Sequence, residues 1–80
     1  MTLNELSINE TCYIKDLLSA GDTRRRMLDM GLIPGTKLIG AFKAPFGEPT
    51  AYLVRGTLIA LRKNDAEKIE IEKTVSREGD

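Results

Sequence analysis

The chain has 80 residues, with 12 basic and 12 acidic side chains, one cysteine and no histidine, and 41% of its residues are hydrophobic. This length suits one small domain, and the composition is typical of a globular protein rather than a disordered one. Without histidine there is no Ser-His-Asp triad and no imidazole zinc site, a lone cysteine forms no internal disulfide, and a net charge of zero provides no general attraction to nucleic acid or membranes.

The first predicted element is a strand over residues 11–18, because Cys12 and Ile14 alternate onto one face with a period of two. A turn-forming segment follows the strand. Within it, Asp22 or Thr23 is suited to cap a helix, since either side chain can accept a hydrogen bond from a free amide of the first turn.

A short helix is predicted over residues 23–30, with Met27 and Met30 three positions apart on one side. Gly31 stands where the helix ends, and a glycine there takes the left-handed conformation without steric cost. Leu32 supplies the hydrophobic contact that often accompanies such a cap.

After a turn at Pro34 and Gly35, the pattern changes from helical to alternating. We predict strands over 36–44, 50–54 and 57–61, a proline-rich hairpin tip at 45–49, a tight turn at 55–56, a helical turn at 64–67 capped by Asn64, and a last strand that contains Ile69 and Ile71.

Five strands of this length are too short to form two packed sheets in 80 residues. Closing one sheet into a barrel removes its exposed edges. We therefore predict a mainly β protein, a small five-stranded β-barrel with one short α-helix between the first and second strands and a helical turn before the last. One domain is expected over residues 1–74, followed by a polar tail over residues 75–80.

The distribution of charge is uneven although the total is zero. Residues 21–63 hold eight basic and three acidic side chains, and the two ends of the chain carry the opposite excess. A local basic patch is therefore expected.

No apolar run reaches the roughly 18 residues of a membrane span, and the N-terminus lacks the features of a signal peptide. We expect a cytoplasmic protein, and the missing catalytic residue types indicate that it is not an enzyme.

Three blocks of the sequence occur in an order typical of one known family. Residues 24–35 read RRRMLDMGLIPG and match the pattern RLxxMGLxPG, with Met27 at the leucine position. Residues 3–14 match an opening pattern LxxLxxGExxxI, with Asn9 in place of glycine. Residues 56–71 match GxxIALRxxEAxxIxV, with Asp65 in place of glutamate. In these blocks the chain resembles the ferrous-iron transport protein A (FeoA) family.

The resemblance implies an SH3-like barrel that acts as an accessory protein of bacterial ferrous-iron uptake. Its partner would be the cytosolic GTPase domain of a FeoB-type membrane iron transporter, whose activity it would modulate, and it would reach the inner face of the membrane only through that partner. No cofactor is implied. The family pattern points to structural roles for Met27, Met30, Gly31, Leu32, Pro34, Gly35, Gly56, Ala60, Leu61 and Ala66.

Sulfur-containing residues are the first candidates for metal ligands. Methionines at helical spacing, such as Met27 and Met30, are usually core residues rather than a soft-metal site. Cys12 lies in a strand, where a lone cysteine is usually a small buried hydrophobe, and the sequence offers it no second cysteine and no histidine as a co-ligand. We therefore predict no metal site.

Three arginines and one aromatic residue are the candidates for partner binding. Arg24, Arg25 and Arg26 are successive on the helix and diverge by about 100°, which suits a solvated face or contact with an acidic or phosphate-bearing partner. Phe46 lies at a hairpin tip between two prolines, where an exposed aromatic ring is costly unless it folds back or meets a partner. We predict Arg24, Arg25 and Phe46 as partner-binding residues.

Two other functions stay open at this stage. A small nucleic-acid-binding barrel is disfavoured by the zero net charge and by the presence of only four aromatic residues. An SH3-like regulatory or interaction module of the iron-dependent repressor type would instead bind a proline-rich or metal-sensing segment of another protein. Homo-oligomerisation also stays open.

Overall fold

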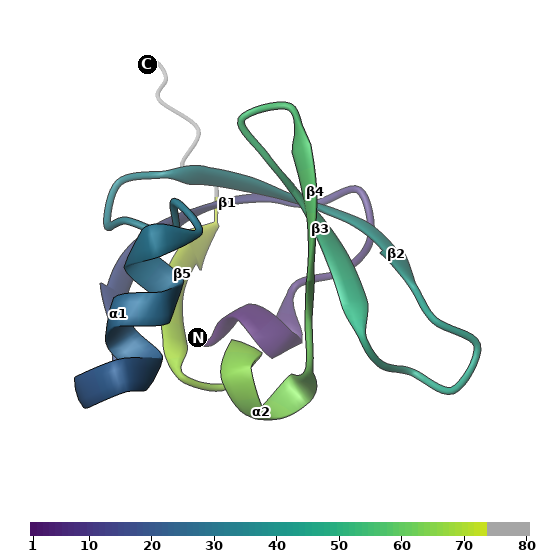
Figure 1. The fold of residues 1–80 in the computed structure, drawn as a ribbon. Coiled ribbons are helices and arrows are strands. Elements are labelled where there is room, and N and C mark those ends of the chain that lie inside the picture. The colour runs from purple at the N-terminus through teal and green to yellow at the C-terminus, as the bar shows by residue number, and fades with distance from the viewer. Residues whose placement is uncertain (74–80) are drawn as a thin grey trace, which may run out of the picture.

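The five strands form one antiparallel sheet with the order β4-β3-β2-β1-β5 in a computed structural model that describes residues 1–73 (Figure 1). The elements in chain order are η1 (Leu3–Glu5), β1 (Thr11–Leu17), α1 (Gly21–Asp29), β2 (Lys37–Lys43), β3 (Thr50–Val54), β4 (Thr57–Leu61), α2 (Lys63–Ala66) and β5 (Ile69–Lys73). Figure 1 shows the sheet bent into an arch, with η1 and α2 in its opening and α1 at one side.

The sheet is strongly curved but not closed, because β4 and β5 are its two edges and do not pair with each other. The predicted closed barrel is wrong in this respect. The chain passes from β4 to β5 through the helical turn α2, and Leu3 of η1 and Ala66 of α2 are both buried there. Short helical segments therefore occupy the opening that a direct β4–β5 pairing would have closed.

The core is built from the residues that alternate onto the concave face of the sheet. In β1 these are Cys12, Ile14 and Leu17, as the period of two predicts for the first two. The other buried members of the cluster are Leu3, Leu6, Met27, Leu32, Leu38, Tyr52, Val54, Leu61, Ala66, Ile69 and Ile71. The predicted last strand, which contains Ile69 and Ile71, is β5 (Ile69–Lys73), and it pairs with β1.

The helix α1 begins two residues earlier than predicted, at Gly21. Its N-cap is Ala20, which makes no side-chain cap bond, so neither Asp22 nor Thr23 has the predicted capping role. The predicted end is confirmed: Gly31 has a φ of +89°, and the amide of Leu32 donates to the Met27 carbonyl at 3.0 Å. This is the bond pattern of a Schellman cap.

The segment before β1 contains a feature that the alternation of residues does not predict. The short helix η1 (Leu3–Glu5) is held by a hydrogen bond from the Thr2 amide to Glu5 Oε1 at 2.8 Å. Asn9, which replaces the glycine of the family pattern, has a φ of +72°. Asparagine tolerates this left-handed conformation better than most residues, so the replacement preserves the turn.

The strand β2 contains a bulge between Gly40 and Phe42, where its pairing with β3 shifts by one residue. A Cβ on Gly40 would lie 2.6 Å from the Ser7 carbonyl oxygen, closer than such atoms approach. The amide of Asn9 donates to the Gly40 carbonyl at 2.7 Å. The glycine is therefore needed for the close approach of the N-terminal segment to the sheet.

The helical turn α2 occupies Lys63–Ala66, one residue before the predicted position, and its N-cap is Arg62. The predicted cap by Asn64 is wrong, because the carboxylate of Glu48 accepts the hydrogen bond of the Lys63 amide at 2.8 Å. A residue from the β2–β3 hairpin thus satisfies the first free amide of α2. The expected polar tail over residues 75–80 lies outside the described residues, and the expected domain over residues 1–74 stays a prediction.

Candidate functional site

The three helix arginines have different environments. Arg24 is half-buried, and its Nη1 donates to the Leu17 carbonyl at 3.0 Å, which ties α1 to the end of β1. Arg26 Nη2 pairs with Asp65 Oδ2 at 3.4 Å and so links α1 to α2. Arg25 is exposed. Two of the three guanidinium groups therefore have contacts within the fold. Of the two arginines predicted to bind a partner, Arg25 is the exposed one.

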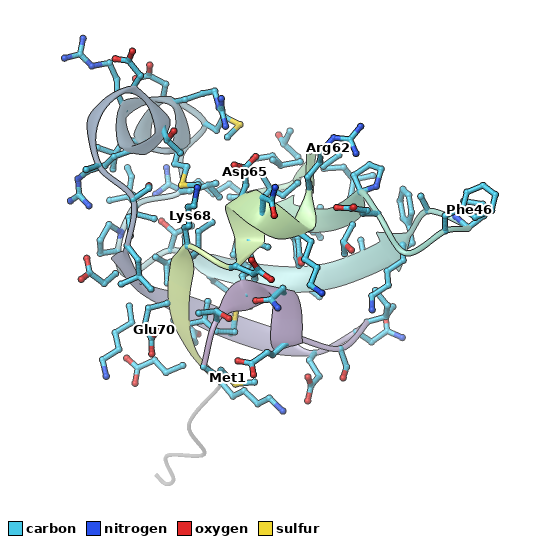
Figure 2. All side chains as sticks on the ribbon, turned by 90° about the horizontal axis from the view of Figure 1, so that it is seen from below. Met1, Phe46, Arg62, Asp65, Lys68 and Glu70 are labelled. Carbon is cyan, nitrogen blue, oxygen red and sulfur yellow. The ribbon has the colours of Figure 1, made fainter. Side chains whose placement is uncertain are left out.

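Phe46 is 97% exposed at the tip of the β2–β3 hairpin, so its ring does not fold back onto the protein. Both views place the tip and α1 at opposite ends of the molecule (Figures 1 and 2). The structure therefore does not bring Phe46 together with Arg24 and Arg25 in one small surface. A partner that contacted all three would have to extend along the whole domain.

The convex side of β2, β3 and β4 carries a second set of exposed apolar side chains. Residues opposite each other on antiparallel strands share a face, and the register gives two such rows across the three strands. One row is Ile39, Leu53 and Leu58, and the other is Phe42, Ala51 and Ala60. We call these six residues the outer apolar face.

The two largest side chains at the margins of this face are the most exposed. Phe42 is 56% exposed and Leu58 53%, whereas Ala51, in the middle of the second row, is buried. The bulge in β2 has a direct effect here, because the shift after Gly40 puts Phe42 opposite Ala51 on the convex side. Contiguous exposed apolar area of this kind is typical of interaction surfaces.

A hollow of about 450 Å³ adjoins the outer apolar face. Ile39 and Leu53 line it together with the basic residues Lys37 and Arg55. The guanidinium of Arg55 donates to Thr36 Oγ1 at 3.4 Å, which holds the arginine at the margin of the hollow. The arrangement offers apolar contact flanked by positive charge, and this combination suits an apolar side chain with an acidic neighbour.

A second hollow, of about 400 Å³, lies beside the hairpin tip. Its lining includes Phe46, Glu48, Lys43 and Lys63, with Tyr52 on the side of the core. The hydroxyl of Tyr52 donates to the Leu3 carbonyl at 3.4 Å, and burial raises the pKa of this phenol. Tyr52 therefore stays neutral at physiological pH and fixes the position of η1, while the two lysines give the hollow a positive margin.

The residues considered as metal ligands lie in the core. Cys12 is fully buried, and burial, with a smaller contribution from Glu10, raises the pKa of its thiol to about 11. Met27 is fully buried and its sulfur accepts a hydrogen bond from Ser19 Oγ at 3.5 Å, while Met30 packs against the core from its edge. Within residues 1–73, no group of three Cys, Asp or Glu side chains is close enough to hold a metal ion.

The residues of the family pattern differ in their positions in the fold. Gly31, Gly35 and Gly56 all have a positive φ, which a glycine adopts without strain. Met27, Leu32, Leu61 and Ala66 are buried in the core, Met30 is partly buried, Pro34 is exposed in the turn, and Ala60 belongs to the outer apolar face.

The outer apolar face was missed by reasoning from the sequence, although one signal was present. The alternation of β4 separates Leu58 and Ala60 from Ile59 and Leu61, and it indicates two apolar faces on one strand. A strand with a core on one side only should carry polar residues on the other. The apolar character of both faces could therefore have indicated a docking surface.

A family model for the FeoA domain matches residues 1–73. The chain belongs to the FeoA family. This confirms the resemblance stated from the sequence blocks. A relative from Porphyromonas gingivalis, a fusion of Fe(2+) transport protein A with the Fe(2+) transporter FeoB, is 33% identical over 72 residues. The match covers 90% of this chain, and the chain spans only 8% of that much longer protein.

Solved structures of FeoA proteins have the same fold. The solution structure of FeoA from Chlorobium tepidum is 33% identical, with a TM-score of 0.88 over 99% of this chain and 75% of that one. The zinc complex of FeoA from Stenotrophomonas maltophilia, described as a prokaryotic SH3 domain protein, is 26% identical, with a TM-score of 0.79 over 90% of this chain and 89% of that one. The architecture is therefore SH3-like, with the open sheet described above.

The relation to ferrous-iron transport rests on the family and on the fusion with a transporter in a relative. Among the residues that the structure describes, no helix is long and apolar enough to cross a membrane.

Proposed function

We propose that this protein is a non-enzymatic accessory component of bacterial ferrous-iron uptake that binds the cytosolic part of a FeoB-type transporter and modulates its activity. The observation that carries the proposal is the Porphyromonas gingivalis relative, in which a domain similar to 90% of this chain is joined covalently to FeoB. Two domains fused in one chain are held at a high effective concentration relative to each other. Where the same two domains belong to separate chains, they must bind each other to stay together.

The surface of the domain supports a binding role. The outer apolar face presents Phe42 and Leu58 to solvent, and the hairpin tip presents Phe46. Aromatic and apolar side chains of this exposure provide most of the affinity when they enter pockets of a partner. Basic side chains lie beside both features and suit a partner of negative charge. Within this proposal the protein acts in the cytoplasm and meets the membrane through the transporter.

The test is a binding measurement with the cytosolic region of the FeoB-type transporter from the same organism. We expect saturable binding by calorimetry, and reduced ferrous-iron uptake in cells that lack this protein. GTP hydrolysis by the transporter, measured with and without the protein, then shows whether modulation acts on the GTPase. The absence of binding together with normal uptake in the deletion strain would overturn the proposal.

A further inference from the structure

The strand β4 is one edge of the sheet, with β3 on one side and no strand on the other within residues 1–73. Its register with β3 is regular over all five residues, from Val54↔Thr57 to Thr50↔Leu61. The turn between them has two residues, Arg55 and Gly56, both with positive φ. These are the features of a tight type I′ hairpin.

The hairpin geometry determines which backbone groups of β4 are directed outward. In a hairpin with a two-residue turn the closing pair is hydrogen-bonded, and the pairs then alternate along the ladder. The pairs of Thr57, Ile59 and Leu61 therefore bond to β3. The amide and carbonyl groups of Leu58 and Ala60 are directed to the free edge, in the same residues whose side chains belong to the outer apolar face.

Proteins usually protect such an edge, and β4 lacks the usual protection. Exposed edge strands are commonly interrupted by a bulge, a proline or a charged side chain. The sequence of β4 is TLIAL, without proline or charge, and its pairing with β3 contains no bulge. The opposite edge of the sheet differs, because Thr2 bridges to Glu70 of β5 and the Ile71 amide donates to the Met1 carbonyl at 2.9 Å.

Both ends of β4 carry positive charge. Arg55 precedes the strand, with its guanidinium held beside Thr36 near the start of β2, and Arg62 and Lys63 follow the strand. Of the carboxylates nearby, Glu48 accepts the bond of the Lys63 amide and Asp65 pairs with Arg26. Figure 2 shows Arg62 projecting outward beside α2. In the described part of the chain, none of the three basic side chains at the ends of β4 has an ion-pair partner.

The charges decide between two occupants of the edge. A second copy of this chain, added through its own β4, would bring basic ends together in either strand direction, because both ends are positive. Like charges at close range oppose such pairing. A partner segment that is apolar at alternate positions and acidic at both ends avoids this repulsion, since its side chains meet Leu58 and Ala60 and its ends are attracted by the three basic residues.

We propose that β4 receives an extended segment of the transporter's cytosolic part as a sixth strand of the sheet. The segment bonds through its backbone to the outward amide and carbonyl groups of Leu58 and Ala60, and its apolar side chains extend the outer apolar face. An acidic residue at one end of the segment pairs with Arg62 and Lys63, and the positive charge of Arg55 attracts the acidic residue at the other end. This inference rests on the proposed function, because it takes the transporter as the partner.

The test compares two substitutions of one residue that differ in the backbone amide. Ala60→Pro removes an amide that makes no bond within the sheet, so a proline is tolerated there as in other edge strands, yet it blocks the addition of a strand. Ala60→Ser keeps the amide and is the matched control. We expect the Kd for the transporter's cytosolic region to rise at least about tenfold for Ala60→Pro and to change little for Ala60→Ser.

A second variant and a direct measurement make the test independent of how well Ala60→Pro folds. Leu58→Lys places on the edge the charge that natural edge strands use for protection, and we expect a similar loss of binding. In the complex of the unchanged protein, amide hydrogen exchange at Leu58 and Ala60 should slow at least about tenfold, as for amides that enter a ladder.

The outcomes separate the two proposals. If the unchanged protein does not bind the cytosolic region, the proposed function and the strand addition both fail. If it binds, but folded Ala60→Pro binds equally well or the two amides exchange as fast as in the free protein, the strand addition alone is wrong. A homodimer that Ala60→Pro dissociates would also overturn it, because the occupant of the edge would then be a second copy.

Discussion

Glu48 and Lys63 are 15 positions apart in sequence, and the carboxylate of Glu48 accepts the hydrogen bond of the Lys63 backbone amide at 2.8 Å. The bond joins the β2–β3 hairpin tip to the first residue of α2. It therefore fixes the position of the tip that presents Phe46, relative to the helical turn that lies in the opening of the sheet.

This bond leads to a prediction for stability. Glu48→Ala leaves the first amide of α2 without its acceptor, and loss of a helix-capping bond costs about 1 kcal/mol. Glu48→Gln retains a side-chain oxygen at the same distance and should cost less. Chemical denaturation measures both free energies of unfolding. Equal stability of Glu48→Ala and the unchanged protein would mean that water replaces the carboxylate without loss.

The arginines of α1 provide a matched pair. Arg24 donates to the Leu17 carbonyl at 3.0 Å and is half-buried, whereas Arg25 is exposed. We expect Arg24→Ala to lower the free energy of unfolding by about 1–2 kcal/mol, because a charged donor is lost and the partly buried Leu17 carbonyl is left without it. Arg25→Ala should stay within about 0.5 kcal/mol of the unchanged protein. Thermal unfolding of the two variants in the same buffer tests the difference, and similar losses for both would contradict it.

Substitution by alanine should destabilise the protein at two glycines, for a different reason at each. At Gly40 an added Cβ meets the Ser7 carbonyl at 2.6 Å, and this backbone atom cannot move without shifting the N-terminal segment. At Gly31 the space is open within 4 Å, but the φ of +89° is strained for any residue with a Cβ. We expect a loss of about 1–2 kcal/mol for Gly31→Ala and about 2–4 kcal/mol for Gly40→Ala. Denaturant midpoints give the order, and a reversed order would show that the N-terminal segment moves easily.

Much of the fold follows from local patterns, and the parts that do not follow have long-range causes. The strands 50–54 and 57–61 were predicted with the bounds that β3 and β4 have, because alternation and turn residues are local signals. The cap of α2 was assigned to Asn64 because the true acceptor, Glu48, lies outside any local window. The open edge was missed for the same reason, since it depends on η1 and α2 occupying the opening of the sheet.

The candidate site was harder to predict than the fold. Phe46 was predicted as a partner-binding residue from its position in a proline-rich tip, and its ring is 97% exposed. The outer apolar face depends on register, however, because Phe42 joins Leu58 on the convex side only through the bulge after Gly40. Sequence patterns do not reveal a one-residue shift in pairing, and this shift reverses the face of every later residue in the strand.

The thiol of Cys12 gives a prediction for alkaline pH. Burial raises its pKa from the usual 9.0 to about 11, so the folded protein holds the proton more tightly than the unfolded chain. The contribution of the protonated Cys12 thiol to the free energy of unfolding is fully present below about pH 9, where the thiol is protonated in both the folded and the unfolded state. This contribution is lost as the pH rises towards 11. We expect the melting temperature of the unchanged protein to fall more steeply over this range than that of Cys12→Ala. The variant is the control for other alkaline groups such as Tyr52, and parallel curves would contradict the shift.

The last prediction separates affinity from association rate. Phe46 is an exposed aromatic ring that lines the hollow beside the hairpin tip together with Lys63, and Arg62, the residue before Lys63, is also an exposed cation. An aromatic anchor acts mainly on dissociation, whereas long-range charge attraction acts mainly on association and is screened by salt. If the transporter's cytosolic region docks on this side, Phe46→Ala should raise the dissociation rate at any salt concentration. Replacing Arg62 and Lys63 with Glu should instead slow association, most clearly at low ionic strength. Arg25→Glu makes the same change of charge on α1, at the other end of the molecule, and tests docking through the helix arginines instead. Stopped-flow kinetics at two salt concentrations distinguishes the cases, and a slower association for Arg25→Glu alone would move the docking surface to the helix.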